Sequence, residues 1–223
     1  MLFRSRAVVL SHGHYDHGGG LLPVLSQAGP LQVLAHPAAF EDKRSAPPGG
    51  PDRFIGLPYD RAAVAAHGGR LRLGTGPQQI GRRLLVTGTV PRTTPFEPAD
   101  PKFQVVRGGE RLTDPFDDDQ AVVVQTGRGL VVLLGCAHAG VINTIHHAQR
   151  LTGEGRVRAV IGGLHLSAAP PARIEQTIAA LQALGVEQVV ACHCTGAHVQ
   201  AELAQALGPR CQPGGVGRQM TFE

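Results

Sequence analysis

The sequence has no tryptophan, and only 4% of its 223 residues are aromatic. Its few cysteines do not form the disulfide framework of a small secreted domain. No apolar run approaches the roughly 18 residues that indicate a transmembrane helix, and no signal-peptide pattern precedes the first motif. We therefore expect a cytoplasmic protein that does not bind membranes. The four cysteines are Cys136, Cys192, Cys194 and Cys211.

Positive charge is present but scattered. The formal net charge is +4, from 21 Lys and Arg against 17 Asp and Glu. Short basic pairs such as Arg82 and Arg83 are not interleaved with aromatic residues, so we expect no nucleic-acid partner. A modest positive excess instead favours an anionic small-molecule substrate. The composition leaves the oligomeric state open.

Length and patterning predict one α/β domain over residues 1–223. Strand and helix signals alternate in the carboxyl half, whereas the segments 44–60 and 93–118 are rich in Pro and Gly and are predicted to be irregular. The first of these is a candidate flexible cover over a site. The predicted strands are 31–35, 83–87, 121–125, 130–134, 158–161 and 188–191, and the predicted helices are 20–28, 140–151, 171–184 and 197–207.

The most informative motif is Ser11-His12-Gly13-His14-Tyr15-Asp16-His17-Gly18-Gly19, which directly follows the apolar run 7–10. A strand that ends there would place four metal-capable side chains in the loop at its carboxyl end. Imidazole and carboxylate suit zinc and similar divalent ions. We predict a site for one or two ions, zinc first, with magnesium or manganese as alternatives. The candidate ligands in this motif are His12, His14, Asp16 and His17.

This pattern, His-x-His-x-Asp-His, resembles the metallo-β-lactamase-fold superfamily. The resemblance implies an αββα sandwich with a one- or two-metal site at the edge of its sheets, and most often metal-assisted hydrolysis. Members of the superfamily normally have several strands before this motif, whereas here it begins within the first dozen residues. We therefore expect that the chain is amino-terminally truncated and lacks strands of the full fold.

Three later histidines follow apolar runs that read as buried strands. His138 follows the run 130–134, and His193 follows the run 188–191. In an α/β fold such strand ends meet at one edge of a sheet, so we expect both to bind metal together with His12. His165 follows the run 158–161 but has a Leu on each side, so we expect it nearer the substrate.

Several other polar residues have weaker interpretations. Cys136 is an alternative ligand beside His138, or simply a small buried residue. The run 117–119, three aspartates, is most simply a solvated turn, with an acid near the metals as the alternative. Arg92 could bind a phosphate or carboxylate. The histidines predicted to be structural or solvent-facing are His36, His67, His146, His147 and His198.

The later motifs resemble one branch of the superfamily, named after the dihydropterin-condensing synthase of methanopterin biosynthesis. Two departures from the broader superfamily are visible. The usual bridging Asp is replaced by the region around Cys136 and His138, and no ligand histidine is evident near 87–92. The matching motifs are 12–19, 35–37, 119–121, 135–140, 162–166 and 193–196.

We predict a metal-dependent hydrolase of this superfamily that attacks a phosphorylated or ester-type small molecule with activated water. Asp16 would orient that water or accept its proton, and His165 is the second candidate catalytic residue. One alternative is a dihydropterin-transferring synthase that uses a pyrophosphate-activated pterin, for which magnesium suits as well as zinc. Another is a metal-binding protein without catalytic activity.

Overall fold

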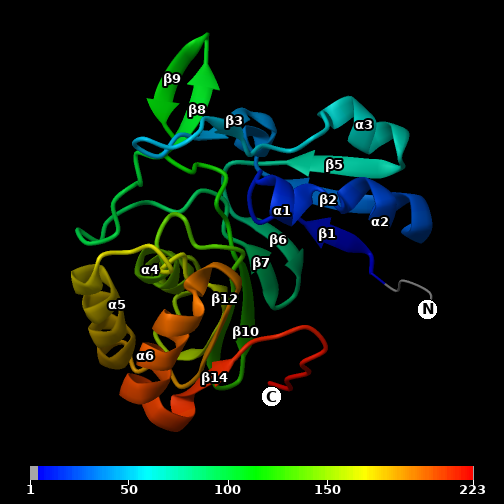
Figure 1. Cartoon of the computed structure of the whole chain (residues 1–223). Helices are drawn as coiled ribbons and strands as arrows, with labels where there is room; N and C mark the ends of the chain where they lie inside the picture. Colours follow the sequence, from blue (N-terminus) through cyan, green and yellow to red (C-terminus); the bar gives the residue numbers. More distant parts are fainter. Residues whose placement is uncertain (1–4, 223) are drawn as a thin grey trace. The chain divides into compact units, whose positions relative to one another are not determined.

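The structure is a computed structural model that describes residues 5–222 (Figure 1). Its contacts divide the chain into two compact units, each built from two stretches of sequence. Unit 1 comprises Met1–Gly76 and Ala99–Asp119, and unit 2 comprises Pro77–Pro98 and Gln120–Glu223. The prediction of a single domain stays a prediction.

Unit 1 contains a parallel sheet in the order β1-β2-β5, formed by β1 (Ala7–Val9), β2 (Leu31–Ala35) and β5 (Gly69–Leu73). Leucine, valine and alanine side chains of these strands and of the connecting helices form its core. The predicted strand 31–35 and the predicted helix 20–28 are confirmed. The helices of this part are α1 (Tyr15–Gly18), α2 (Leu21–Ala28) and α3 (Arg61–Ala66), with a 3₁₀ turn η1 (Pro37–Phe40).

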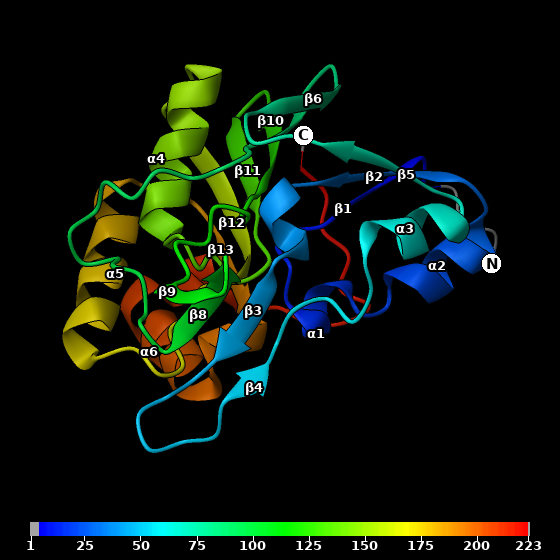
Figure 2. The same cartoon turned by 90° about the horizontal axis from the view of Figure 1, so that it is seen from above.

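A second, antiparallel sheet of unit 1 corrects the sequence analysis. Its order is β4-β3-β8-β9, and Figure 2 shows β3 beside β4 and β8 beside β9. The segments 44–60 and 93–118 were predicted to be irregular, but they contain strand residues. These strands are short, and several of their residues are polar and exposed, so hydrophobic alternation is weak. They are β3 (Asp42–Ser45), β4 (Arg53–Phe54), β8 (Phe103–Arg107) and β9 (Glu110–Thr113).

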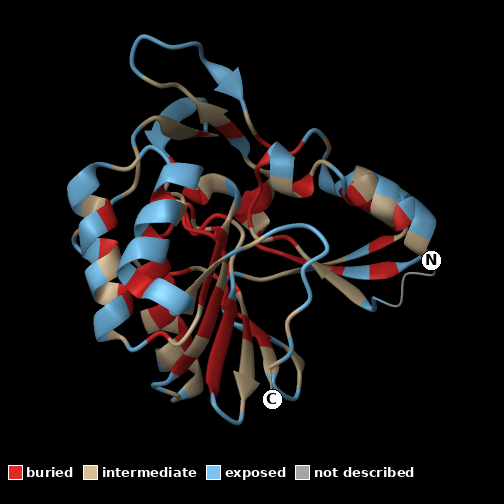
Figure 3. Ribbon diagram, turned by 60° about the horizontal axis from the view of Figure 1, so that its bottom comes forward, coloured by how far each residue is buried: buried red, intermediate tan, exposed pale blue. Residues whose placement is uncertain are grey.

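Unit 2 contains a seven-stranded sheet in the order β14-β13-β12-β11-β10-β7-β6. The four strands from β11 to β14 are parallel, and the remaining pairs are antiparallel. Buried residues, red in Figure 3, run along its central strands. The strands are β6 (Gln78–Gly81), β7 (Leu84–Val86), β10 (Val122–Thr126), β11 (Gly129–Leu133), β12 (Val157–Gly163), β13 (Val189–Cys192) and β14 (Cys211–Pro213).

Three helices of unit 2 pack their apolar residues into one core with these strands. The predicted helices 140–151, 171–184 and 197–207 are confirmed with shifts of a residue at their ends. Within residues 5–222, no helix is both long and apolar enough to cross a membrane. The helices are α4 (Val141–Thr152), α5 (Pro171–Ala183) and α6 (Ala197–Leu207), with 3₁₀ turns η2 (His193–Thr195) and η3 (Gly208–Arg210).

The parallel strands place three loops at one edge of the large sheet. Leu133 on β11 pairs with Ile161 on β12, and Gly163 on β12 pairs with Cys192 on β13. Because neighbouring parallel strands end at the same edge, the segments that follow β11, β12 and β13 all begin there. Each of these segments contains one of the histidines predicted to belong to the site.

Candidate metal centre

The first candidate ligands lie in the loop between β1 and α1 of unit 1. The Nε2 atom of His12 and the Nδ1 atom of His14 are 3.1 Å apart. That separation is close to the ~3.3 Å expected for two imidazole nitrogens on one tetrahedral ion. Both side chains are buried, and His14 is the N-cap residue of α1. The local fold therefore brings two of the predicted ligands, His12 and His14, close together.

The other two donors of the motif lie on α1 itself. The ring centroids of His17 and His12 are 4.2 Å apart, and the Nε2 atom of His17 is 3.5 Å from the Oδ2 atom of Asp16. The Ser11 hydroxyl lies 3.1 Å from Nδ1 of His12 and 3.5 Å from Nδ1 of His17. The loop after β1 and the single turn of α1 thus bring four donors of the predicted set into one cluster, with Asp16 at its exposed side.

The protonation state of His14 suits metal binding. Burial, followed by the charge of Lys43, lowers the pKa of His14 to about 4. Its imidazole is therefore neutral at physiological pH. A neutral imidazole offers a nitrogen lone pair to a divalent ion, whereas an imidazolium does not.

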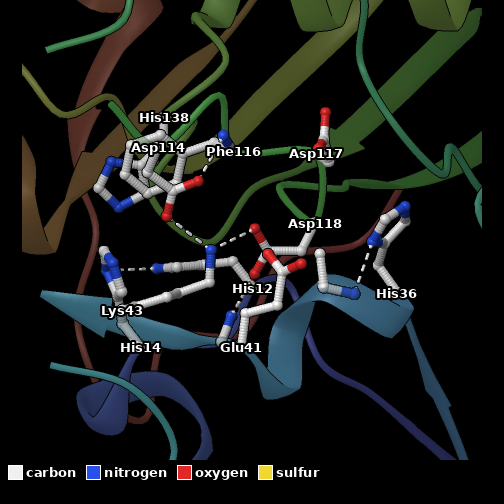
Figure 4. A network of polar contacts seen from close by, with 12 residues as sticks. His12, His14, His36, Glu41, Lys43, Asp114, Phe116, Asp117, Asp118 and His138 are labelled. Atoms are coloured by element: carbon white, nitrogen blue, oxygen red, sulfur yellow. Dashed lines mark hydrogen bonds and ion pairs between the residues drawn. The ribbon is translucent and has the colours of Figure 1, made fainter. Parts of the chain in front are cut away.

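A network of buried charged side chains contacts the loop between β1 and α1 (Figure 4). The Nζ atom of Lys43 donates to Oδ1 of Asp118 at 2.8 Å and to Oδ2 of Asp114 at 2.7 Å. The second oxygen of Asp118 accepts a 2.7 Å hydrogen bond from the backbone N–H of Gly13, between the two ligand histidines. A charged side-chain cluster therefore fixes the backbone of the motif.

Asp118 corrects the prediction of a solvated turn at 117–119. Asp118 is completely buried and Asp119 is 3% exposed, and only Asp117 reaches solvent, where it accepts a hydrogen bond from Arg107. The alternative interpretation, an acid close to the ligand loop, describes Asp118. Hydrogen bonds from Lys43 and from Gly13 compensate the burial of its charge.

Lys43 stays protonated in this environment. Burial lowers the pKa of Lys43, but the carboxylates of Asp118 and Asp114 outweigh this effect and raise it. The ammonium group also lies 5.3 Å from the centre of the Phe116 ring. Sequence reasoning missed Lys43 and Asp114, since nothing in the local pattern distinguishes them from surface charges.

The histidines of unit 2 lie at the edge of the sheet where the sequence predicted them. The ring centroids of His138 and His165 are 4.2 Å apart. The Sγ atom of Cys136 lies within 4.8 Å of a ring nitrogen of His138 and, likewise, of His193. Three strand-end loops thus converge within this unit. The further expectation that His138 and His193 bind the same ions as His12 stays a prediction.

The backbone of these loops is strained at the candidate residues. Ala137, His165 and His193 have φ angles of 55°, 48° and 51°. Residues other than glycine rarely adopt this left-handed conformation, and each instance costs on the order of 1–3 kcal/mol. Such strain is concentrated at functional sites in many proteins, and here it coincides with two histidines that the sequence had singled out.

Arg92 and Glu97 hold the loop after β11 from inside unit 2. The Arg92 guanidinium, for which the sequence suggested anion binding, donates to the backbone carbonyls of His138 and Glu97, at 2.9 and 3.0 Å. The carboxylate of Glu97 accepts from the backbone N–H groups of Ile142 and Asn143, at 2.9 and 2.8 Å. Glu97 therefore caps α4. The sequence did not predict this role, because Glu97 lies 45 residues before Ile142.

Three of the histidines predicted to be structural or solvent-facing contact backbone groups. His36 accepts a hydrogen bond from the Ala38 N–H and caps η1. His67 and His147 each place a ring nitrogen near a backbone carbonyl oxygen, at 2.8 and 3.3 Å.

The donor set fits a divalent metal. The loop after β1 offers three imidazoles and one carboxylate, and the edge of the large sheet offers two imidazoles and a thiol. Nitrogen, oxygen and sulfur donors of these types are the ligands of zinc. The candidate ligands are His12, His14, Asp16 and His17 in unit 1, and His138 and His193 in unit 2.

Comparisons with known proteins identify the family. The model of the Metallo-beta-lactamase superfamily matches residues 2–148. A crystal structure of a metal-dependent hydrolase of the beta-lactamase superfamily is 32% identical, with a TM-score of 0.76, and the match covers 95% of this chain and 76% of the other.

Two curated relatives come from Methanocaldococcus jannaschii. One is 7,8-dihydropterin-6-methyl-4-(beta-D-ribofuranosyl)-aminobenzene-5'-phosphate synthase, 29% identical over 85% of this chain and 66% of its own length. The other is an uncharacterised protein, 28% identical over 89% of this chain and 72% of its own length. This chain thus spans about two thirds to three quarters of the relatives it matches. This chain has a mixed α/β fold like that of the crystal structure, and it belongs to the metallo-beta-lactamase superfamily, whose members bind divalent metals, often zinc.

Proposed function

We propose that this chain is a metal-dependent hydrolase that cleaves a phosphorylated or ester-type small molecule. It would use one or two divalent ions, with zinc as the preferred candidate. The observation on which this rests is the cluster of His12, His14, Asp16 and His17 in one loop, with His14 held neutral by burial. The 32% identical metal-dependent hydrolase supports the same reaction class.

The chemistry divides between the ion and the side chains. A zinc ion bound by these residues would supply hydroxide near neutral pH, because it would lower the pKa of its water towards ~7. The carboxylate of Asp16 is exposed next to the histidine cluster, so it can orient the attacking water and accept its proton. His165, in ring contact with His138, can bind the substrate or protonate the leaving group.

The net charge of +4 supports an anionic small molecule as the substrate. A phosphoryl group or a carboxylate would provide that charge. An ester or phosphoester bond is also one that hydroxide can attack without a further cofactor.

A second candidate is a dihydropterin-transferring synthase, supported by the 29% identical relative of that name. In that reaction the amine of one organic substrate would displace pyrophosphate from another, and water would not attack. The two candidates therefore differ in their stoichiometry. A synthase needs two organic substrates and releases pyrophosphate, whereas a hydrolase consumes one substrate and water.

Metal analysis and a substrate screen test the proposal. Purified wild type should contain at least one zinc equivalent, and His14→Ala should lose most of it, whereas the exposed His67→Ala should retain it. A screen of phosphoesters, lactones and pterins should give turnover that chelators abolish. Equal metal content in wild type and His14→Ala would refute the metal site, and turnover only with two organic substrates would select the synthase.

A further inference from the structure

Cys136 is placed differently from the other three cysteines of the chain. Its side chain is 3% exposed, and its Sγ atom lies within 4.8 Å of ring nitrogens of both His138 and His193. The two histidines come from different loops, after β11 and after β13. A small buried residue that only filled space would not need two imidazoles from separate loops beside its sulfur.

The remaining thiols have other environments. The Cys194 thiol lies 3.8 Å from the backbone carbonyl oxygen of Cys136, to which it donates. Burial raises the pKa of the Cys211 thiol, which favours its protonated form. Among residues 5–222, Cys136 is the one cysteine grouped with histidines at metal-binding spacing.

The backbone of both loops favours this convergence. Ala137 lies between Cys136 and His138 and has a φ angle of 55°, and His193 itself has a φ of 51°. A left-handed residue changes the local direction of the chain. The sulfur of Cys136 has one imidazole from each of the two loops within 4.8 Å.

We propose that the thiolate of Cys136 is a metal ligand, and that it binds beside the imidazole of His138 or of His193. On binding, the Sγ–H bond breaks, the Sγ–metal bond forms, and the proton passes to solvent. Two ligand atoms of one tetrahedral ion lie about 3.5 Å apart, so side-chain adjustments of an ångström or so suffice.

This inference rests on the proposed metal-dependent function and specifies its metal. Thiolate is a soft ligand that selects zinc, whereas magnesium prefers oxygen donors. A thiolate beside an imidazole therefore favours zinc over magnesium. It also favours water activation over the magnesium-assisted release of pyrophosphate.

Cobalt substitution of the full chain tests the ligand directly. Co²⁺ replaces zinc and, when a thiolate binds it, gives a charge-transfer band in the near ultraviolet in addition to its d–d bands. We expect the band in wild type, its loss in Cys136→Ser and its retention in Cys211→Ser, the matched control. Zinc affinity should fall at least about tenfold in Cys136→Ser, since even residues outside the ligand set change affinity by that much.

A second variant keeps the test decisive if Cys136→Ser does not fold. Substitution of Cys192, Cys194 and Cys211 together by serine leaves Cys136 as the one thiol, and the band should persist. Its absence there, or its survival in a folded Cys136→Ser, overturns the inference. If wild type binds cobalt but its spectrum shows only d–d bands, Cys136 is not a thiolate ligand. The proposed metal-dependent function would then still stand. A wild type that binds no cobalt or zinc refutes both.

Discussion

The backbone N–H of Gly13 donates a 2.7 Å hydrogen bond to the Oδ2 atom of Asp118, 105 residues further along the chain. Gly13 lies between His12 and His14, so this bond fixes the peptide that sets the directions of both imidazoles. Lys43 and Asp114 in turn fix the carboxylate. The geometry of the ligand loop therefore depends on a charged cluster that provides none of the candidate ligands.

Asp118→Ala should lower both stability and metal affinity. It leaves Lys43 with one carboxylate and removes the acceptor of the Gly13 amide. Breaking a buried ion pair on one side costs about 3–5 kcal/mol, and loss of a supporting contact lowers metal affinity about 10- to 100-fold. Urea unfolding and zinc titration measure the two effects. Asp117→Ala, at a partly exposed neighbour, is the control, and equal zinc affinity in both variants would contradict the role of Asp118.

Gly13→Ala should be strongly destabilising although alanine is only one methyl group larger. A Cβ atom at this position would lie 2.0 Å from the backbone oxygen of Ala39, which cannot move as a flexible side chain could. We expect the free energy of unfolding to fall by about 1–3 kcal/mol. Gly20→Ala is the control, because a Cβ there meets no atom within 4 Å. Similar unfolding midpoints for the two variants would be inconsistent with the close approach.

His165→Gln should lower turnover while the bound metal remains. His165 contacts the His138 ring and belongs to the loop after β12, whereas the candidate ligands of unit 2 belong to the loops after β11 and β13. We expect kcat to fall about 10²- to 10⁴-fold, the range for loss of a general acid or base, with zinc content within error of wild type. Loss of zinc in this variant would instead make His165 a ligand.

His147 should make the metal-free chain less stable as the pH falls. Burial lowers the pKa of His147 below its ordinary value of 6.5, so the unfolded chain binds a proton more readily than the folded one. The contribution of the neutral ring is complete above pH 6.5 and decreases below it. His147→Gln keeps a donor for the Thr87 carbonyl but does not titrate. Urea unfolding with chelator at pH 7, 6 and 5 should show a shallower loss in this variant, and parallel curves would argue against the shift.

The sequence predicted the elements whose pattern is local. The β10–β11 hairpin follows from two apolar runs around Thr126–Gly129, and α5 follows from its initial prolines and the apolar period beginning at Ile174. The cluster of His12, His14 and His17 was likewise predictable, because residues two to five positions apart in one loop stay close in almost any fold.

Contacts between distant segments could not be predicted in this way. β3 is a four-residue strand that gains its order by pairing with β8, which lies about sixty residues later. Lys43 has its carboxylate partners 71 and 75 residues away. A single sequence contains no signal for such long-range pairs, and the polar character of these residues suggested surface loops.

The division of each unit into two stretches has a consequence for how the chain matures during synthesis. β3 leaves the ribosome well before its partner β8, and β6 and β7 emerge between them. A nascent chain ending at Gly76 lacks one of the two neighbours of β3 and both carboxylates that neutralise Lys43. Unit 2 in turn acquires β6 and β7 before any of its helices. Unit 1 can therefore complete its pairings only after Asp119 has been made, and unit 2 only after β14 has been made. Their long-range pairings should make both steps slow.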